Sequence, residues 1–145
     1  YNNRPVGVFG DVSTFSFYGN KTITTGEGGM VLFKNKDNYE KGLILRDHGM
    51  SKSKRYWHDI IGFNYRLTNL QAAIGVAQFE QLGDFVNAKI KIANIYNNRL
   101  SKSNFFQIPA NIPNTINSFW LYTIILNKEA PFTRDELMQY LSLCE

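Results

Sequence analysis

The chain has 145 residues, of which 43% are hydrophobic and 19% charged, and its formal net charge is +4. These values are typical of a globular protein and exclude a disordered chain, and the length allows one domain with a sizeable core. No apolar run approaches the roughly 20 residues of a membrane helix, so we expect no membrane partner. Cys144 is the single cysteine, which excludes a disulfide framework and favours a reducing compartment, the cytoplasm.

The charged residues and the histidines argue against two further kinds of ligand, nucleic acids and metal ions. The densest basic cluster is Lys52, Lys54 and Arg55. It favours a solvated loop over a nucleic-acid patch, so we expect no nucleic-acid partner, and small anionic ligands remain an alternative. His48 and His58 are the two histidines, and they lie too far apart in sequence to form a helical metal pair. We therefore expect no metal site.

Two apolar, β-prone runs near the start, residues 12–18 and 29–33, enclose a loop that carries Lys21. A Gly-Asn turn precedes the lysine, and hydroxyl groups and glycines follow it. We predict two strands that hold a partly desolvated amine between them. Burial lowers the pKa of a lysine, and a neutral amine can form a Schiff base with a carbonyl group.

The residues around Lys21 also suit a phosphate group. The loop glycines leave the backbone accessible, and the neighbouring hydroxyl groups belong to Ser16, Thr22, Thr24 and Thr25. A lysine beside a phosphate cradle is the minimum for a pyridoxal phosphate site. An ordinary solvated lysine loop remains the alternative reading of the same residues.

The same stretch does not form the phosphate loop of an NTPase. Asn20 separates Gly19 from Lys21, and Thr14 stands where the first glycine of that motif would fall. The pattern therefore fails at two points.

Helical spacing begins after the second apolar run. Asp37 and Glu40 have the spacing of a capping box, and Gly49 would end the helix that they open. Residues 51–58 are polar and basic, which predicts a surface loop that can fold over a ligand.

The second half begins with another capping box, Thr68 and Gln71, and continues as a long helical pattern with a predicted bend near Gly83. Residues 101–117 are rich in Asn, Ser and Pro, which predicts a loop and a domain boundary. A strand over 119–126 would follow, and then a last helix. Thr133 and Glu136 are the capping box that opens it.

Two segments resemble one known family. Residues 16–30 read SFYGNKTITTGEGGM and are similar to the lysine segment of the DegT/DnrJ/StrS group of nucleotide-sugar aminotransferases. Residues 56–75 read YWHDIIGFNYRLTNLQAAIG and are similar to a second segment of the same group. The resemblance is clear over residues 6–100. Within the group, both segments are most similar to enzymes that aminate GDP-4-keto-6-deoxymannose.

The resemblance implies an α/β fold, namely a fragment of a fold-type-I pyridoxal-phosphate transferase like aspartate aminotransferase. Residues 1–82 would be the C-terminal part of the cofactor-binding large domain. Residues 83–104 would be a linking helix, and residues 105–145 the beginning of the small C-terminal domain. Chains of the group are longer and carry an upstream carboxylate for the pyridinium nitrogen. We therefore expect an internal fragment, or the ordered part of a longer chain, whose activity belongs to the parent.

The resemblance also implies which residues hold the cofactor. Lys21 would bind it through its amine and move a proton during catalysis. Ser16 would bind its phosphate within one subunit, and Asn64 would reach the phosphate of the partner subunit in a homodimer or a dimer-based higher oligomer. A cap on its own turn is the alternative role of Asn64.

Four residues are candidates for substrate binding. His48 follows a stretch that lies near the active site in the family, or it simply ends a helix, where positive charge is favoured. Tyr56 and Trp57 can stack on a nucleotide base, pack against a partner subunit or anchor the core. Arg66 can bind an anion or pair with an acidic neighbour.

The implied reaction is transamination of a 4-keto-6-deoxy nucleotide sugar, with glutamate as amino donor, in the biosynthesis of O-antigen or another surface polysaccharide. Lys21 favours transamination over dehydration, because dehydratases of the family carry histidine at the lysine position. Two alternatives stay open. One is a dTDP- or UDP-linked sugar substrate, and the other is a non-catalytic regulatory or interaction domain that binds pyridoxal phosphate.

Overall fold

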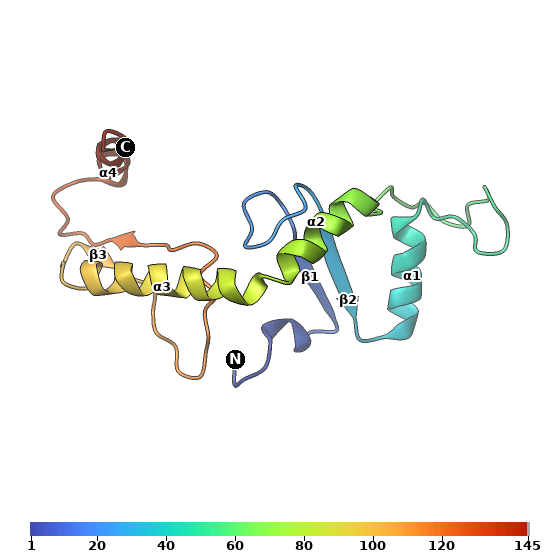
Figure 1. The fold of residues 1–145 in the computed structure, drawn as a ribbon, viewed down its shortest axis with the longest axis horizontal. Coiled ribbons are helices and arrows are strands. Elements are labelled where there is room, and N and C mark those ends of the chain that lie inside the picture. Colours follow the sequence, from blue (N-terminus) through green and yellow to red (C-terminus); the bar gives the residue numbers. More distant parts are fainter. Residues whose placement is uncertain (145) are drawn as a thin grey trace. The chain divides into compact units, whose positions relative to one another are not determined.

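The computed structural model describes residues 1–144, which fall into two units, Tyr1–Leu82 and the segment from Gly83 onward. Figure 1 shows the order of the helices and strands in each unit. None of the helices within the described residues is both long and apolar enough to cross a membrane.

An antiparallel hairpin forms the centre of the first unit. After a short 3₁₀ turn (Val6–Val8), β1 (Val12–Ser16) pairs with β2 (Gly29–Phe33). Val12 lies opposite Phe33, and Ser16 lies opposite Gly29. Both predicted strands are confirmed, although β1 ends at Ser16, before the last two residues of the predicted run. The loop that carries Lys21 therefore leaves and rejoins the hairpin at the same end.

Helix α1 (Lys36–Arg46) packs beside β2 (Figure 1). The predicted capping box of Asp37 is wrong, because Asn35 caps the helix instead. Its Oδ1 accepts the backbone N–H groups of Asp37 at 2.8 Å and Asn38 at 3.1 Å. A glycine, Gly42, allows the close packing, since a Cβ atom there would lie 2.8 Å from the ring of Phe33.

Helix α2 (Asn69–Phe79) begins at the predicted capping box, which is confirmed. Thr68 Oγ1 accepts the N–H of Gln71 at 3.2 Å, and Gln71 Oε1 accepts the N–H of Thr68 at 3.0 Å. Helix α3 (Leu82–Leu100) follows after a break at residues 80–81. The sequence predicted one helix with a bend near Gly83, whereas the chain forms two helices that separate just before it.

The second unit places a small hairpin after α3. Strand β3 (Phe106–Gln107) pairs with β4 (Ile125–Leu126) in antiparallel fashion. β3 lies inside the predicted loop, and the strand predicted over 119–126 keeps only its last two residues. Tyr122 instead turns to α3, where its hydroxyl donates to Asn97 Oδ1 at 2.6 Å. Burial raises the pKa of this hydroxyl above its ordinary value.

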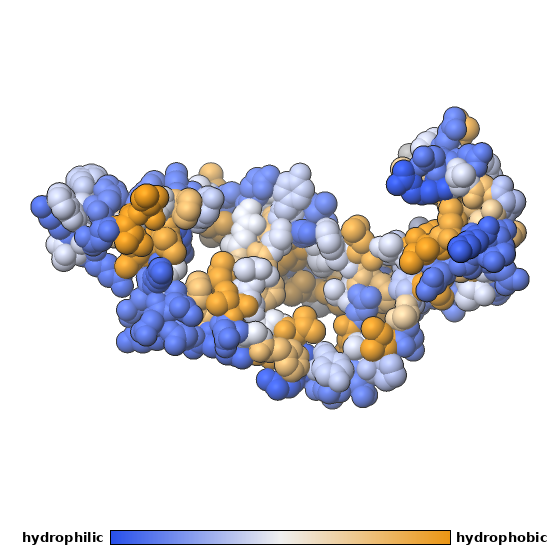
Figure 2. Space-filling view, turned by 180° about the vertical axis from the view of Figure 1, so that it is seen from behind, coloured by the Kyte–Doolittle hydropathy of each residue, from blue (hydrophilic) through white to orange (hydrophobic). Residues whose placement is uncertain are grey.

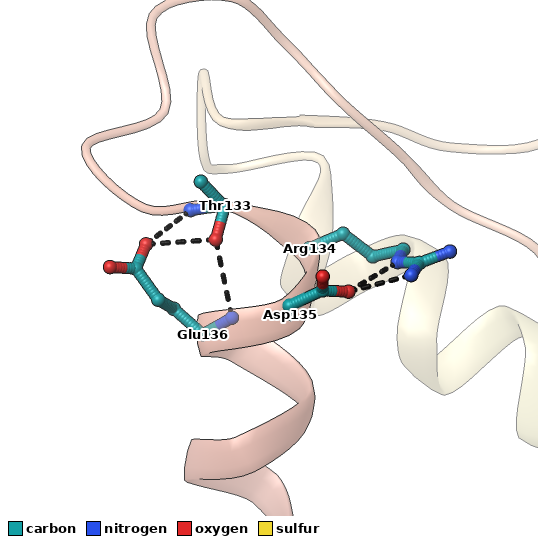
Figure 3. Close-up of polar contacts among 4 residues, drawn as sticks. All are labelled: Thr133, Arg134, Asp135 and Glu136. Atoms are coloured by element: carbon teal, nitrogen blue, oxygen red, sulfur yellow. Dashed lines mark hydrogen bonds and ion pairs between the residues drawn. The ribbon is translucent and has the colours of Figure 1, made fainter.

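Helix α4 (Arg134–Ser142) begins at the third predicted capping box, which is also confirmed (Figure 3). Glu136 Oε2 accepts the N–H of Thr133 at 2.7 Å and its hydroxyl at 2.9 Å. These hydrogen bonds lower the pKa of the Glu136 carboxyl group below its ordinary value, the backbone N–H having the largest effect. Arg134 and Asp135 form an exposed ion pair beside the cap.

Few side chains are buried. Among the described residues, Ala93 is 1% exposed and Thr25 is 5% exposed, while most large apolar side chains reach the solvent. Figure 2 shows these apolar residues as several separate areas of the surface. The length of the chain allows a sizeable core, but its hydrophobic residues do not form one among themselves.

Candidate functional site

The loop between β1 and β2 holds Lys21 in a closed, hydrogen-bonded frame. The N–H of Phe17 donates to the carbonyl of Gly28 at 2.8 Å, and the N–H of Thr25 donates to the carbonyl of Phe17 at 3.0 Å. The N–H of Lys21 donates to the carbonyl of Tyr18 at 3.0 Å, which forms a turn before the lysine. The lysine is half-buried, so part of its side chain is screened from water.

The hydroxyl groups around Lys21 divide into two kinds. Thr24 Oγ1 donates to the carbonyl of Phe17 at 2.9 Å, and Thr25 Oγ1 donates to the carbonyl of Glu27 at 2.7 Å. These two threonines therefore use their hydroxyl hydrogens to fold the loop, and they do not form the predicted phosphate cradle. Ser16 Oγ accepts the N–H of Tyr18 at 3.3 Å, which leaves its own hydroxyl hydrogen able to donate to a ligand.

His48 and Asn64 lie on adjacent segments of the first unit. The chain after α1 forms an isolated bridge between Asp47 and Asn64, and the N–H of His48 donates to the carbonyl of Phe63 at 2.9 Å. Both side chains are exposed. The side-chain amide of Asn64 makes no hydrogen bond to any described residue, so the structure shows no cap on its own turn.

Tyr56 and Trp57 lie in the exposed loop over residues 51–58. The guanidinium group of Arg55 lies 4.9 Å from the centre of the Tyr56 ring, and Lys54 Nζ lies 4.2 Å from that of Trp57. The side chains are 72% and 55% exposed, respectively. The alternative that they anchor the core is therefore wrong for both within this chain, and stacking on a ligand or packing against a partner remains open.

Arg66, one of the predicted substrate residues, lines a hollow in the first unit. The hollow is open, has a volume of about 310 Å³ and is lined by α1 and the segment after it. Arg66 Nη1 lies 3.5 Å from Asp47 Oδ1, so the predicted acidic neighbour is present. The pair is exposed and therefore weak. The other basic side chains that line the hollow are Arg46 and Lys52.

One residue near the lysine loop was not expected from the sequence. Gln78, in α2, accepts the N–H of Thr24 through its Oε1 at 2.8 Å. The available signal was its position two helical turns after Gln71 in a helix rich in alanine. No cluster of three or more metal-binding side chains occurs within residues 1–144.

Comparison with known proteins identifies the group to which this arrangement belongs. Residues 1–144 match the DegT/DnrJ/EryC1/StrS aminotransferase family. A GDP-perosamine synthase from Vibrio cholerae is 49% identical over 140 residues, and the chain covers 38% of its length. A GDP-perosamine synthase from Escherichia coli O157:H7 is 43% identical over 142 residues, again with 38% of its length covered. The chain thus spans less than two fifths of these relatives.

A solved structure shows the same fold. The GDP-4-keto-6-deoxy-D-mannose-3-dehydratase of E. coli, with bound hydrated pyridoxal phosphate, superposes with a TM-score of 0.91 at 22% identity. The superposition covers 99% of this chain and 41% of the dehydratase chain. Together with the match to the aminotransferase family, this likeness makes the α/β arrangement part of a fold-type-I transferase. With the family match over nearly its whole length, the chain belongs to the DegT/DnrJ/EryC1/StrS aminotransferase family.

Proposed function

We propose that this chain supplies the lysine segment of a pyridoxal-phosphate-dependent aminotransferase that acts on a 4-keto-6-deoxy nucleotide sugar. Glutamate would donate the amino group, and GDP-4-keto-6-deoxymannose would be converted to GDP-perosamine for O-antigen or another surface polysaccharide in the cytoplasm. One observation carries the proposal. Lys21 is half-buried in a closed loop between two paired strands, in a chain of the aminotransferase family.

The residues present fit pyridoxal phosphate. Lys21 offers an amine for the carbonyl group of the cofactor, and Ser16 offers a hydroxyl hydrogen for its phosphate at the end of β1. Pyridoxal phosphate, when bound, supplies an electron sink for the carbon that loses its proton. Lys21 Nζ would take the proton from Cα of glutamate and would later return a proton to C4 of the sugar.

A first experiment tests the role of Lys21. The full-length protein that carries this sequence is mixed with pyridoxal phosphate and reduced with borohydride, and the labelled peptide is mapped by mass spectrometry. We expect the label on Lys21 and not on exposed lysines such as Lys52 and Lys54. A Lys21→Ala variant should lose both the label and turnover. Scattered labelling, or full activity in the variant, would contradict the proposal.

Asn64 supports a homodimer with shared sites, because its amide is exposed and makes no bond to the described residues. We propose that it contacts the cofactor phosphate of the partner subunit. Lys21→Ala and Asn64→Ala variants, each inactive alone, are unfolded and refolded together. In a twofold dimer, random pairing should restore about a quarter of the wild-type activity, because each mixed dimer has one intact site. Activity no higher than that of the separate variants would place both residues in one subunit.

The substrate is tested by direct competition. The full-length protein is supplied with glutamate and equal amounts of GDP-, dTDP- and UDP-linked 4-keto-6-deoxy sugars. We expect the GDP sugar to be aminated first, since GDP-perosamine synthases are 49% and 43% identical to this chain. Four exposed side chains are proposed to bind this substrate, namely His48, Tyr56, Trp57 and Arg66. Binding of the cofactor without amination of any sugar would favour a regulatory domain instead.

A further inference from the structure

Helix α2 is hydrogen-bonded to the lysine loop at two points. Gln78 Oε1 accepts the N–H of Thr24 at 2.8 Å, and Gln71 Nε2 donates to the carbonyl of Glu27 at 3.0 Å. The two glutamines are two helical turns apart, so they share one face of α2. Figure 1 shows α2 running across the β1–β2 hairpin, beside the loop that connects its strands.

The surface between the two glutamines fits the loop closely. Gly75 lies between them on the same face, and a Cβ atom there would lie 3.0 Å from Thr25 Cγ2. Thr25 is 5% exposed, which makes it one of the least exposed side chains that the structure describes. The face formed by Gln71, Gly75 and Gln78, here called the α2 clamp, therefore leaves no space for the loop to move toward the helix.

The two bonds of the α2 clamp differ in how easily they can be replaced. The carbonyl of Glu27 also accepts the hydroxyl of Thr25, so it keeps a partner without Gln71. The N–H of Thr24 is part-buried, and Gln78 is the partner shown for it. A backbone donor left without an acceptor in such a place is costly, so Gln78 is the residue on which the loop position depends.

We propose that Gln78 is a positioning residue, which fixes the loop of residues 17–28 and thereby the direction from which the Lys21 amine meets the cofactor. The inference rests on the proposed function of Lys21, and it adds a residue of α2 to those named there. Gln78 acts through the backbone of Thr24, three residues after the lysine. A displaced loop would misplace the amine, because catalysis depends on positions held within a fraction of an ångström.

The test compares three variants of the full-length protein. Gln78→Leu removes the acceptor oxygen at similar volume, and Gln78→Glu restores an oxygen that can accept from Thr24. Gln81→Leu is the matched control, since Gln81 lies in the break after α2 and its side chain donates to the carbonyl of Ala77, four residues earlier in the chain. Gln78→Asn, whose shorter side chain cannot reach the loop, replaces the leucine variant if that variant does not fold.

Two measurements are made on each variant. The first is hydrogen exchange at the Thr24 amide in cofactor-free protein, which reports the loop bond itself. We expect about tenfold faster exchange in Gln78→Leu, near wild-type exchange in Gln78→Glu and no change in Gln81→Leu. The second is dissociation of pyridoxal phosphate, followed by the absorbance of the lysine-bound cofactor. We expect pyridoxal phosphate to dissociate faster from Gln78→Leu, at a near wild-type rate from Gln78→Glu and at an unchanged rate from Gln81→Leu. In Gln78→Leu, kcat should be reduced and KM for the nucleotide sugar unchanged.

The outcomes separate this inference from the proposed function. Thr24 exchange that is equal in Gln78→Leu and Gln81→Leu would overturn the role of Gln78. Faster exchange in Gln78→Leu with unchanged cofactor release and kcat would show a merely structural bond and would also overturn it. Wild-type protein that binds no cofactor at Lys21 would overturn the proposed function, and the role of Gln78 with it.

Discussion

His48 has a backbone conformation that glycine usually adopts. It follows the last residues of α1 with φ at 61°, and the N–H of the next residue, Gly49, donates to the carbonyl of Ile44 at 2.9 Å. This is the bond of a Schellman cap, in which the left-handed position belongs most often to glycine. The sequence suggested Gly49 as the end of the helix, whereas the left-handed residue directly after the cap is the histidine.

His48→Gly should therefore stabilise the protein by about 1 kcal/mol, because glycine adopts positive φ without steric cost. His48→Ala is the control, since alanine keeps the strain and removes the imidazole. Urea unfolding of the full-length protein measures the difference between the two variants. If His48 binds substrate, KM rises in both variants while stability rises in only one. A glycine variant that is less stable than the alanine variant would contradict the cap.

Glu136 predicts a pH effect at the start of α4. Its hydrogen bonds to the N–H and hydroxyl of Thr133 hold the pKa of the carboxyl group below its ordinary value. A lowered pKa in the folded state means that the charged form stabilises the helix. This contribution is present above the pKa of the unfolded chain and is lost as the pH falls through the folded value.

An NMR titration of the Glu136 carboxyl group checks this prediction. Thr133→Ser keeps the hydroxyl and should keep the lowered pKa, whereas Thr133→Ala should move the pKa back toward its ordinary value. A pKa that is the same in all three proteins would show that the hydroxyl of Thr133 has no part in lowering it, and that the backbone N–H alone does so. Glu136→Gln should weaken the dependence of helix content on pH over the same acidic range.

Capping boxes were predictable from the sequence where the cap and its partner are the best local choice. Thr68 and Thr133 satisfy this condition, and both boxes form. Asp37 does not, because Asn35 offers its carboxamide oxygen to two N–H groups from a position slightly earlier in the chain. Gln78 could not be predicted as a loop contact, since its partner lies 54 residues away in sequence.

Among the elements, the segment after α1 depends on two glycines that face each other. Gly49 has φ at 70°, and a Cβ atom there would lie 1.9 Å from the carbonyl oxygen of Ile60. A Cβ atom at Gly62 would lie 2.1 Å from the backbone nitrogen of Gly49. The two backbone segments thus lie so close together that neither position could carry a side chain. His48 and Asn64 lie on these two adjacent segments.

Gly49→Ala should destabilise the protein by about 3 kcal/mol or more, from backbone strain together with the clash. Gly83→Ala is the matched change, because Gly83 lies in α3 and nothing surrounds its Cβ position within 4 Å. The free energy of unfolding of that variant should rise by at most about 1 kcal/mol, because alanine has a higher helix propensity than glycine. Urea unfolding of both variants gives the comparison. Equal stabilities would show that the segment after α1 adjusts without cost.

The elements themselves were predictable to different degrees. The β1–β2 hairpin follows from two apolar runs and its glycines, and the helices follow from their spacing and caps. β3 and β4 have two residues each, too few to give a periodic pattern. The sequence around Tyr122 looks like a strand, but its hydroxyl bond to Asn97 and its stacking on Tyr96 direct it to α3.

For the whole molecule, exposed area is the dominant feature. The chain exposes 12003 Å². A folded monomer of its mass, 16.7 kDa, would expose about 7,600 Å². Treating the two units as separate small domains raises the expected area only to about 9,200 Å². Composition could not predict that the exposed area is larger than expected. It reports how many residues are apolar and not whether they can bury one another.

Residues 1–145 produced alone should therefore behave as a loosely packed chain. Its helices have their own caps, so far-ultraviolet circular dichroism should show helix. Its apolar side chains, among them Phe15, Val31 and Ile95, are about half exposed, so the chain should bind the dye ANS. Urea unfolding should be gradual, with a slope below the roughly 1–3 kcal/mol/M of small cooperative proteins. The full-length protein is the control and should unfold cooperatively without binding the dye. A sharp transition of the isolated chain without dye binding would mean that it packs its apolar residues by itself, which contradicts the exposed surface described above.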